Sequence, residues 1–182
     1  MIQSPKDALL TVGKIVARLL QGMCALAGGG LLLLIPIVVL LSQNMLPGFG
    51  GANDSETIKA SPLTVVAICA TLALILAALF LFFGKLRAII VSAGEGDPFT
   101  PENASRLDAM AWLFLGVKIL GMLVAGLRLH LANLMDTDAN GENSLGFSLY
   151  DLDAIVIVIV LFILASIFRH GAAMREDLKG TV

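Results

Sequence analysis

The residues of this chain whose types could do chemistry gather in one polar segment, EGDPFTPENASRLDAMAW, residues 95–112. This segment holds two prolines, four acids, an asparagine and an arginine, and long apolar runs flank it on both sides. It carries no nucleophile–histidine–acid arrangement and no cysteine, histidine and carboxylate cluster with metal-ligand spacing. The chain has two histidines, His130 and His170, and they lie near the ends of different apolar runs. We therefore expect no catalytic residues, no cofactor, no metal and no enzymatic activity.

Composition indicates a membrane protein. The 182 residues are 58% hydrophobic and 14% charged, and the mean hydropathy is +0.92. A soluble domain has about a quarter of its residues charged. A net charge of -2 gives no field that would attract nucleic acid, so we expect no direct contact with it. Cys24 and Cys69 both lie in apolar runs and are interpreted as small packing residues.

The apolar runs predict four membrane spans, because a helical span needs about 20 mostly apolar residues. The fold class expected is therefore all-α, a single four-span membrane domain over residues 1–182 folded as a four-helix bundle. Pairs of small residues four positions apart predict close helix packing. The expected spans are approximately 15–41, 63–83, 109–131 and 154–168. The small-residue pairs are Ala25 with Gly29, Ala73 with Ala77, and Gly121 with Ala125.

Basic residues near the span ends predict the orientation, because lysine and arginine accumulate on the cytoplasmic side. Nine of these basic residues precede or open the first span, lie between the second and third, or follow the fourth, and only Lys59 lies in the other loops. Both termini, the loop and helix start at 84–108, and the tail at 169–182 are thus expected in the cytoplasm. Residues 132–153 are expected to form an acidic extracytoplasmic loop.

The acidic loop contains one pattern that resembles a calcium site. Asp136, Asp138 and Asn140, followed by Gly141, match the opening of an EF-hand loop. However, Phe147 stands at the twelfth position, where that loop requires a bidentate glutamate. A solvated acidic turn is therefore favoured over a calcium site.

Two charges lie inside the third span, where they are costly. Arg128 is near the outer end and can snorkel or pair with Asp151 or Asp153. Lys118 is deeper, ~13 Å past the start of the apolar run at 1.5 Å per residue. It either snorkels or meets a polar partner such as Gln21, or it contacts a ligand or a lipid headgroup.

The pattern of the polar segment predicts a turn followed by a capped helix. Gly94 and Gly96 end the preceding helix, and Asp97-Pro98 favours a turn. Thr100 is an N-cap, and Pro101 fits the first helical position. A helix from there to residue 131 would be ~46 Å long, more than the ~30 Å hydrocarbon core. It should therefore project into the cytoplasm and display the side chains of Glu102, Asn103, Arg106 and Asp108.

The C-terminal tail predicts a similar extension. Met174 and Leu178 form an apolar pair at helical spacing within RHGAAMREDLKG, and Gly180 suits a helix stop. The third and fourth helices are thus both expected to extend into the cytoplasm.

The strings GDPFTPENASRL and MREDLKGTV resemble the bacterial family called domain of unknown function twenty-nine seventy-five. The matching positions of the first string are Gly96, Asp97, Pro98, Phe99, Pro101, Glu102, Asn103, Arg106 and Leu107. The resemblance implies a small four-span protein of the bacterial cytoplasmic (inner) membrane, over essentially the whole chain, with no settled biochemical activity. It also implies a partner, because members are often encoded beside a short helix-turn-helix regulator of the Xre/Cro type.

Together these patterns predict a non-enzymatic regulatory or interaction protein of the lipid bilayer, which holds a soluble helix-turn-helix regulator at the membrane. One alternative is a small transporter or channel subunit that uses Lys118 and Arg128, with a homo-oligomer supplying the pore. Another is a structural subunit of a larger membrane complex. The expected partner-binding residues are Asp97, Pro98, Phe99, Pro101, Glu102, Asn103, Arg106, Arg175, Glu176 and Asp177.

Overall fold

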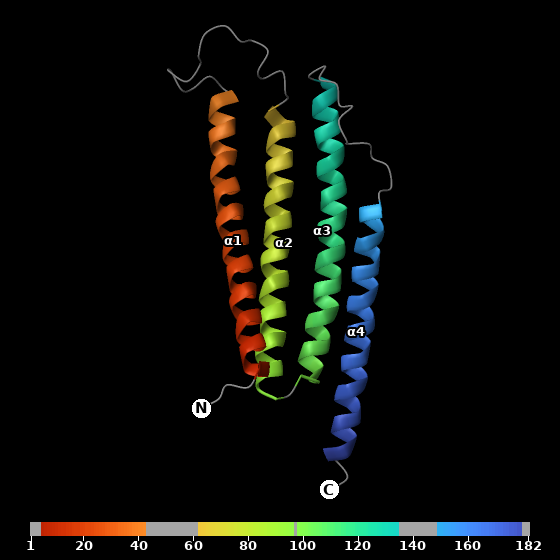
Figure 1. The fold of residues 1–182 in the computed structure, drawn as a ribbon. Helices are drawn as coiled ribbons and strands as arrows, with labels where there is room; N and C mark the ends of the chain where they lie inside the picture. The colour runs from red at the N-terminus through yellow and green to blue at the C-terminus, as the bar shows by residue number, and fades with distance from the viewer. Residues whose placement is uncertain (1–4, 43–61, 97, 135–148, 180–182) are drawn as a thin grey trace. The chain divides into compact units, whose positions relative to one another are not determined.

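Four long helices make up the structure, a computed structural model that describes residues 5–42, 62–96, 98–134 and 149–179 (Figure 1). The described residues contain no strand, so the all-α prediction is confirmed. Of the expected acidic loop, residues 135–148, with the EF-hand-like residues, lie outside them. The loop bounds of 132–153 are too wide, because residues 132–134 belong to the third helix and 149–153 to the fourth. The helices are α1 (Pro5–Ser42), α2 (Pro62–Gly94), α3 (Pro101–Leu134) and α4 (Leu149–Lys179).

Each helix is long and apolar enough to cross a membrane. The candidate spans are Leu10–Ile37, Leu63–Gly94, Pro101–His130 and Asp153–Asp177. The predicted count of four is therefore confirmed, and the chain is a multi-pass membrane protein. The helices are longer than the predicted spans. α2 continues beyond residue 83 to Gly94, and α4 continues beyond residue 168 to Lys179.

The chain divides into two compact units. The first comprises Met1–Cys24, Ala78–Val117 and Ser148–Val182, and the second comprises Ala25–Ala77 and Lys118–Phe147. α1, α2 and α3 contribute to both units, whereas α4 lies entirely in the first. All the contacts described below lie within one unit.

In the first unit, α1 and α2 pack antiparallel through glycines of both helices. A Cβ atom added at Gly13 would lie 3.5 Å from the side chain of Ile90, and one at Gly94 would lie 3.7 Å from Leu10. Further along α1, Gln21 Nε2 is 3.2 Å from the corresponding position at Gly84. As the residue number rises along α1 it falls along α2, which defines the antiparallel register.

Aromatic contacts continue this packing from α2 to α3 and from α3 to α4. The ring centroids of Phe82 and Phe114 are 6.2 Å apart, and Trp112 meets Phe162 edge to face at 5.8 Å. The buried apolar residues of this unit concentrate in the first turns of α3, with one alanine on α1 and two on α4. They are Ala17, Ala104, Leu107, Met110, Ala111, Ala154 and Ala165.

In the second unit, a Cβ atom added at Gly28 would lie 3.6 Å from Leu76 Cβ. Two of the three predicted small-residue pairs, Ala25 with Gly29 and Gly121 with Ala125, do not form packing surfaces within the described residues. A Cβ atom at Gly29 or Gly121 would meet nothing within 4 Å, and the neighbouring Ala25 is exposed. That prediction is wrong because the covered positions of α1 follow a different stripe, which runs through residues 10, 13, 17, 21, 24 and 28. Gly29 is one position, or about 100° of helix rotation, away from that stripe.

Candidate functional site

The site begins where α2 ends, at a turn that needs glycine. The amide of Glu95 donates to the carbonyl oxygens of Val91 and Ser92, both at 3.2 Å, and the amide of Gly96 donates to that of Ala93 at 3.4 Å. Gly96 has a φ of +90°, a region that side chains with a Cβ rarely adopt. The predicted helix break is therefore confirmed. Asp97 lies outside the described residues.

Thr100 caps α3 as predicted. Its Oγ1 accepts a hydrogen bond from the amide of Asn103 at 3.2 Å. Its carbonyl oxygen accepts bonds from the amides of Asn103 and Ala104 at 3.1 and 3.2 Å. Pro101 is the first helical residue, where the missing N–H costs nothing. Glu102 in the first turn complements the helix dipole.

Asn103 is the centre of the turn, and it is fully buried. Its Nδ2 donates to Ser92 Oγ and to the carbonyl oxygen of Pro98, both at 2.9 Å. Its Oδ1 accepts a bond from Arg106 Nη1 at 2.7 Å. One side chain thus ties the end of α2, the connecting loop and α3 together.

The prediction that Asn103 is displayed is therefore wrong. A pattern in the sequence could have predicted that Asn103 is buried. Asn103, Leu107, Met110 and Ala111 are spaced so that they fall on one helical face. Three of these residues are apolar, so this face predicts burial of the asparagine as well.

The side chain of Phe99, in the turn, packs against α4. Its ring centroid is 5.0 Å from that of Phe168. A Cβ atom added at Gly171 would come within 2.9 Å of Phe99 Cδ1, so the ring packs directly against the α4 backbone. Asp108 forms an ion pair with Arg169 of α4. The polar segment and the α4 extension, far apart in sequence, thereby become one surface.

We call this surface the platform and define it by the residues around a pocket of about 400 Å³: Phe99, Thr100, Pro101, Glu102, Ala172, Arg175 and Glu176. Six of the predicted partner-binding residues have exposed side chains, namely Phe99, Pro101, Glu102, Arg175, Glu176 and Asp177. Arg106 is half-buried and donates to Asn103, and Pro98 contributes its carbonyl oxygen to the same asparagine.

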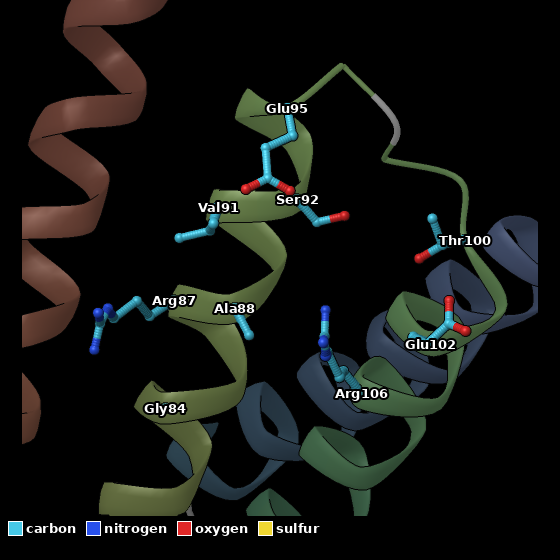
Figure 2. Close-up of a pocket in the computed structure, with 9 residues that line it drawn as sticks. All are labelled: Gly84, Arg87, Ala88, Val91, Ser92, Glu95, Thr100, Glu102 and Arg106. Carbon is cyan, nitrogen blue, oxygen red and sulfur yellow. The ribbon is translucent and has the colours of Figure 1, made fainter.

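A second pocket, of about 430 Å³, lies along the end of α2 and the start of α3 (Figure 2). Figure 2 shows the Arg106 side chain extending from α3 toward α2, with Arg87 on the other flank of α2. Glu95 and Glu102 lie nearer the connecting turn. We call this the α2–α3 pocket. No pattern in the sequence predicted this pocket, because it depends on the packing of two helix ends.

The remaining candidate residues belong to the other compact unit. Lys118 is half-buried and Arg128 is exposed, both on α3. Within the described ranges, no three histidine, cysteine or acidic side chains come together as metal ligands. Cys24 and Cys69 are free thiols, each half-buried.

Comparison with known proteins gives one match. No curated protein and no solved structure resembles the chain significantly. The profile of one protein family matches residues 49–182, which include the second, third and fourth helices, the capped turn and the platform. Since this match covers most of the sequence, the chain belongs to the family described as "Protein of unknown function (DUF2975)".

Proposed function

We propose that this protein is a non-enzymatic regulator that holds a small soluble helix-turn-helix protein of the Xre/Cro type at the cytoplasmic face of the bacterial inner membrane. The observation that carries the proposal is the platform. The family's polar segment and the α4 extension meet there as one surface, through Phe99, Phe168 and Gly171. A structural subunit would not need a polar surface held this firmly at the end of its spans.

The proposed orientation places both termini and the platform in the cytoplasm. Its support is the distribution of basic residues: nine lie near the span ends on the side that carries the termini, and Lys59 alone lies in the loops at the other end. Lysine and arginine of short loops are retained on the cytoplasmic side.

Charge suits the platform to a basic partner. Glu102 and Glu176 border its pocket together with Arg175, and Asp177 follows on the exposed side of α4, so the acidic side chains outnumber the basic one. The DNA-binding face of a helix-turn-helix protein is basic, because it contacts phosphates. An acidic platform would compete with DNA for that face, and so would keep the regulator inactive while it is bound.

Release would follow from a movement of α3 and α4. Phe99 contacts Phe168, and Asp108 pairs with Arg169, so a shift of either helix changes the platform. A signal in the bilayer or at the far loops that displaces these helices would therefore alter the affinity for the partner.

The test is affinity capture of the tagged protein, after cross-linking in its native membrane, with identification of the partners by mass spectrometry. Glu102→Lys combined with Glu176→Lys reverses two exposed charges that make no structural hydrogen bond among the described residues. The matched control is Asp153→Lys, an exposed acid near the other end of α4.

We expect the unaltered protein and the control to capture a helix-turn-helix protein, and the double variant to recover about tenfold less, since two charge contacts are reversed. Occupancy of the regulator's promoter should then rise in cells that carry the double variant. Equal recovery by all three proteins, or recovery of integral membrane proteins alone, would contradict the proposal and favour a structural subunit or transport through Lys118.

A further inference from the structure

The basic and acidic side chains of the α2–α3 pocket lie at different positions along the helix axes. Arg87 precedes Glu95 by eight residues, and Arg106 follows Glu102 by four. At 1.5 Å per residue, these spacings correspond to about 12 and about 6 Å along the respective helices. Both arginines are half-buried on the side of the spans, whereas both glutamates are exposed and nearer the turn.

A smaller pocket of about 250 Å³ adjoins the α2–α3 pocket and extends it toward the apolar part of α2. The two pockets share Gly84, Ala88 and Arg106. Lys85 lines the smaller pocket beside Arg106, and the exposed side chains of Phe80 and Leu81 line its far end. Moving toward the turn, a molecule lying across both pockets would therefore meet apolar side chains, then cations, then carboxylates.

The cations of this site are available to a ligand. An arginine carries five N–H donors, and Arg106 uses one of them for Asn103 Oδ1. In the part of the chain that the structure describes, no carboxylate forms an ion pair with Lys85, Arg87 or Arg106. Anions that satisfy such donors in a partly buried position are held by charge-assisted hydrogen bonds.

We propose that the two pockets together bind a phospholipid with a phosphoethanolamine headgroup. The phosphate lies against Lys85 and Arg106, the ammonium group points toward Glu95 and Glu102, and an acyl chain follows Phe80 and Leu81. This order is the order of the same groups in a bilayer leaflet, where the acyl chains are innermost. The proposal rests on the membrane placement of the helices and does not require the helix-turn-helix partner.

The glutamates give the site its specificity. An anionic lipid such as phosphatidylglycerol carries the same phosphate but no ammonium group, so the two carboxylates would repel its net negative charge and would have no cation to contact. A choline headgroup carries a cation but no N–H donor, and so cannot make hydrogen bonds to the carboxylates. We therefore expect ethanolamine lipids to bind more tightly than glycerol or choline lipids with the same acyl chains.

The experiment is native mass spectrometry of the full-length protein in detergent, titrated with phosphatidylethanolamine, phosphatidylglycerol or phosphatidylcholine of identical chains. Lys85→Gln should weaken binding of phosphatidylethanolamine about tenfold, the effect of losing one charge-assisted bond. Glu95→Gln should remove much of the preference over phosphatidylcholine while leaving the phosphate contact. Arg18→Gln, at an exposed arginine of α1 outside both pockets, is the control and should bind as the unaltered protein does.

Neither test residue makes a side-chain hydrogen bond or ion pair within the described residues, so both variants should fold. Equal binding of the three lipids, or unchanged binding by Lys85→Gln, would overturn the proposal. Preference for phosphatidylglycerol that Glu95→Gln strengthens would assign an anionic lipid instead. Soluble glycerophosphoethanolamine forms the last arm: we expect no competition at equal concentration, and full displacement of the lipid would assign a soluble ligand and overturn the lipid assignment.

Discussion

The two halves of α3 differ sharply although one continuous helix forms both. In the first half, from Pro101 to Val117, the buried residues are Asn103, Ala104, Leu107, Met110 and Ala111. From Lys118 to His130, the only buried residue is Val124. The first half thus packs against protein with both polar and apolar side chains, whereas the second half has a single buried residue between exposed and half-buried ones.

The two halves therefore constrain the sequence in different ways. In the second half, hydrophobicity alone suffices, and one aliphatic residue can replace another facing lipid. In the first half, each residue has a particular partner: Asn103 with Ser92, and Arg106 with Asn103. Changes of similar size should therefore have large effects near the turn and small effects beyond Lys118.

Asn103→Ala should have the largest effect. It removes three side-chain hydrogen bonds and leaves the carbonyl oxygen of Pro98 and the guanidinium of Arg106 without their partner. Loss of a buried polar network of this size costs about 2–3 kcal/mol. The midpoint of thermal unfolding, measured on the detergent-solubilised protein, should fall accordingly.

The matched control is Ser105→Ala, an exposed position two residues further along α3. It should leave the unfolding midpoint nearly unchanged. An equal effect of the two substitutions would mean that the buried network does not stabilise the turn, and the contrast between the halves of α3 would lose its basis.

Gly171→Ala should have the next largest effect. The added Cβ atom would lie 2.9 Å from the Phe99 ring, so the ring or α4 must move. Overpacking costs about 1–3 kcal/mol, and alanine returns up to about 1 kcal/mol through its helix propensity. A net loss of about 1 kcal/mol is expected in thermal unfolding, together with weaker capture of the partner.

Two further variants test whether the contact with the Phe99 ring causes the effect of Gly171→Ala. Gly116→Ala, on α3, meets nothing within 4 Å and should not destabilise the protein. In a Phe99→Ala background, Gly171→Ala should also cost nothing, because the clash is absent. A persistent cost in that background would show that the backbone of Gly171, and not the ring, sets the effect.

Much of the fold was predictable from sequence because its signals are local. The span count depends on runs of apolar residues, and Thr100 with Pro101 marks the start of α3 through chemistry within one turn. The contact of Phe99 with Gly171 and the pairing of Asp108 with Arg169 join residues more than 60 positions apart. No local pattern encodes such a contact, so the sequence predicted that both segments bind the partner together but not the contacts that join them.

For two of the three small-residue pairs the error is the opposite one: a local pattern predicted a contact that is absent from the described part of the structure. Ala25 and Gly29 have the spacing of a packing motif, yet the covered face of α1 lies one position away, through Ala17 and Gly28. Glycine and alanine are common in apolar helices, so spacing alone does not identify the buried face.

Asp108→Asn should have a small effect that depends on salt. The pair with Arg169 is solvent-accessible, with side-chain exposures of 33% and 64%, and exposed ion pairs contribute about 0–1 kcal/mol. The difference in unfolding midpoint from the unaltered protein should shrink as salt is raised. Arg169→Gln should give the same difference, and the double variant should add nothing further. A salt-independent loss would mean that Asp108 acts through another contact.

Gly29→Ala and Gly121→Ala should change the unfolding midpoint least, and should raise it where the other variants lower it. Nothing within 4 Å would contact the added methyl groups, and alanine favours a helix over glycine by up to about 1 kcal/mol. Each variant should therefore unfold at the same or a slightly higher temperature, with the same particle mass by light scattering in detergent. A lower midpoint together with a smaller particle mass would show that a second copy packs closely against these glycines. The chain would then associate through α1 if Gly29→Ala has this effect, and through the second half of α3 if Gly121→Ala has it. An interface on α3 would supply the oligomer that a transport pathway through Lys118 requires.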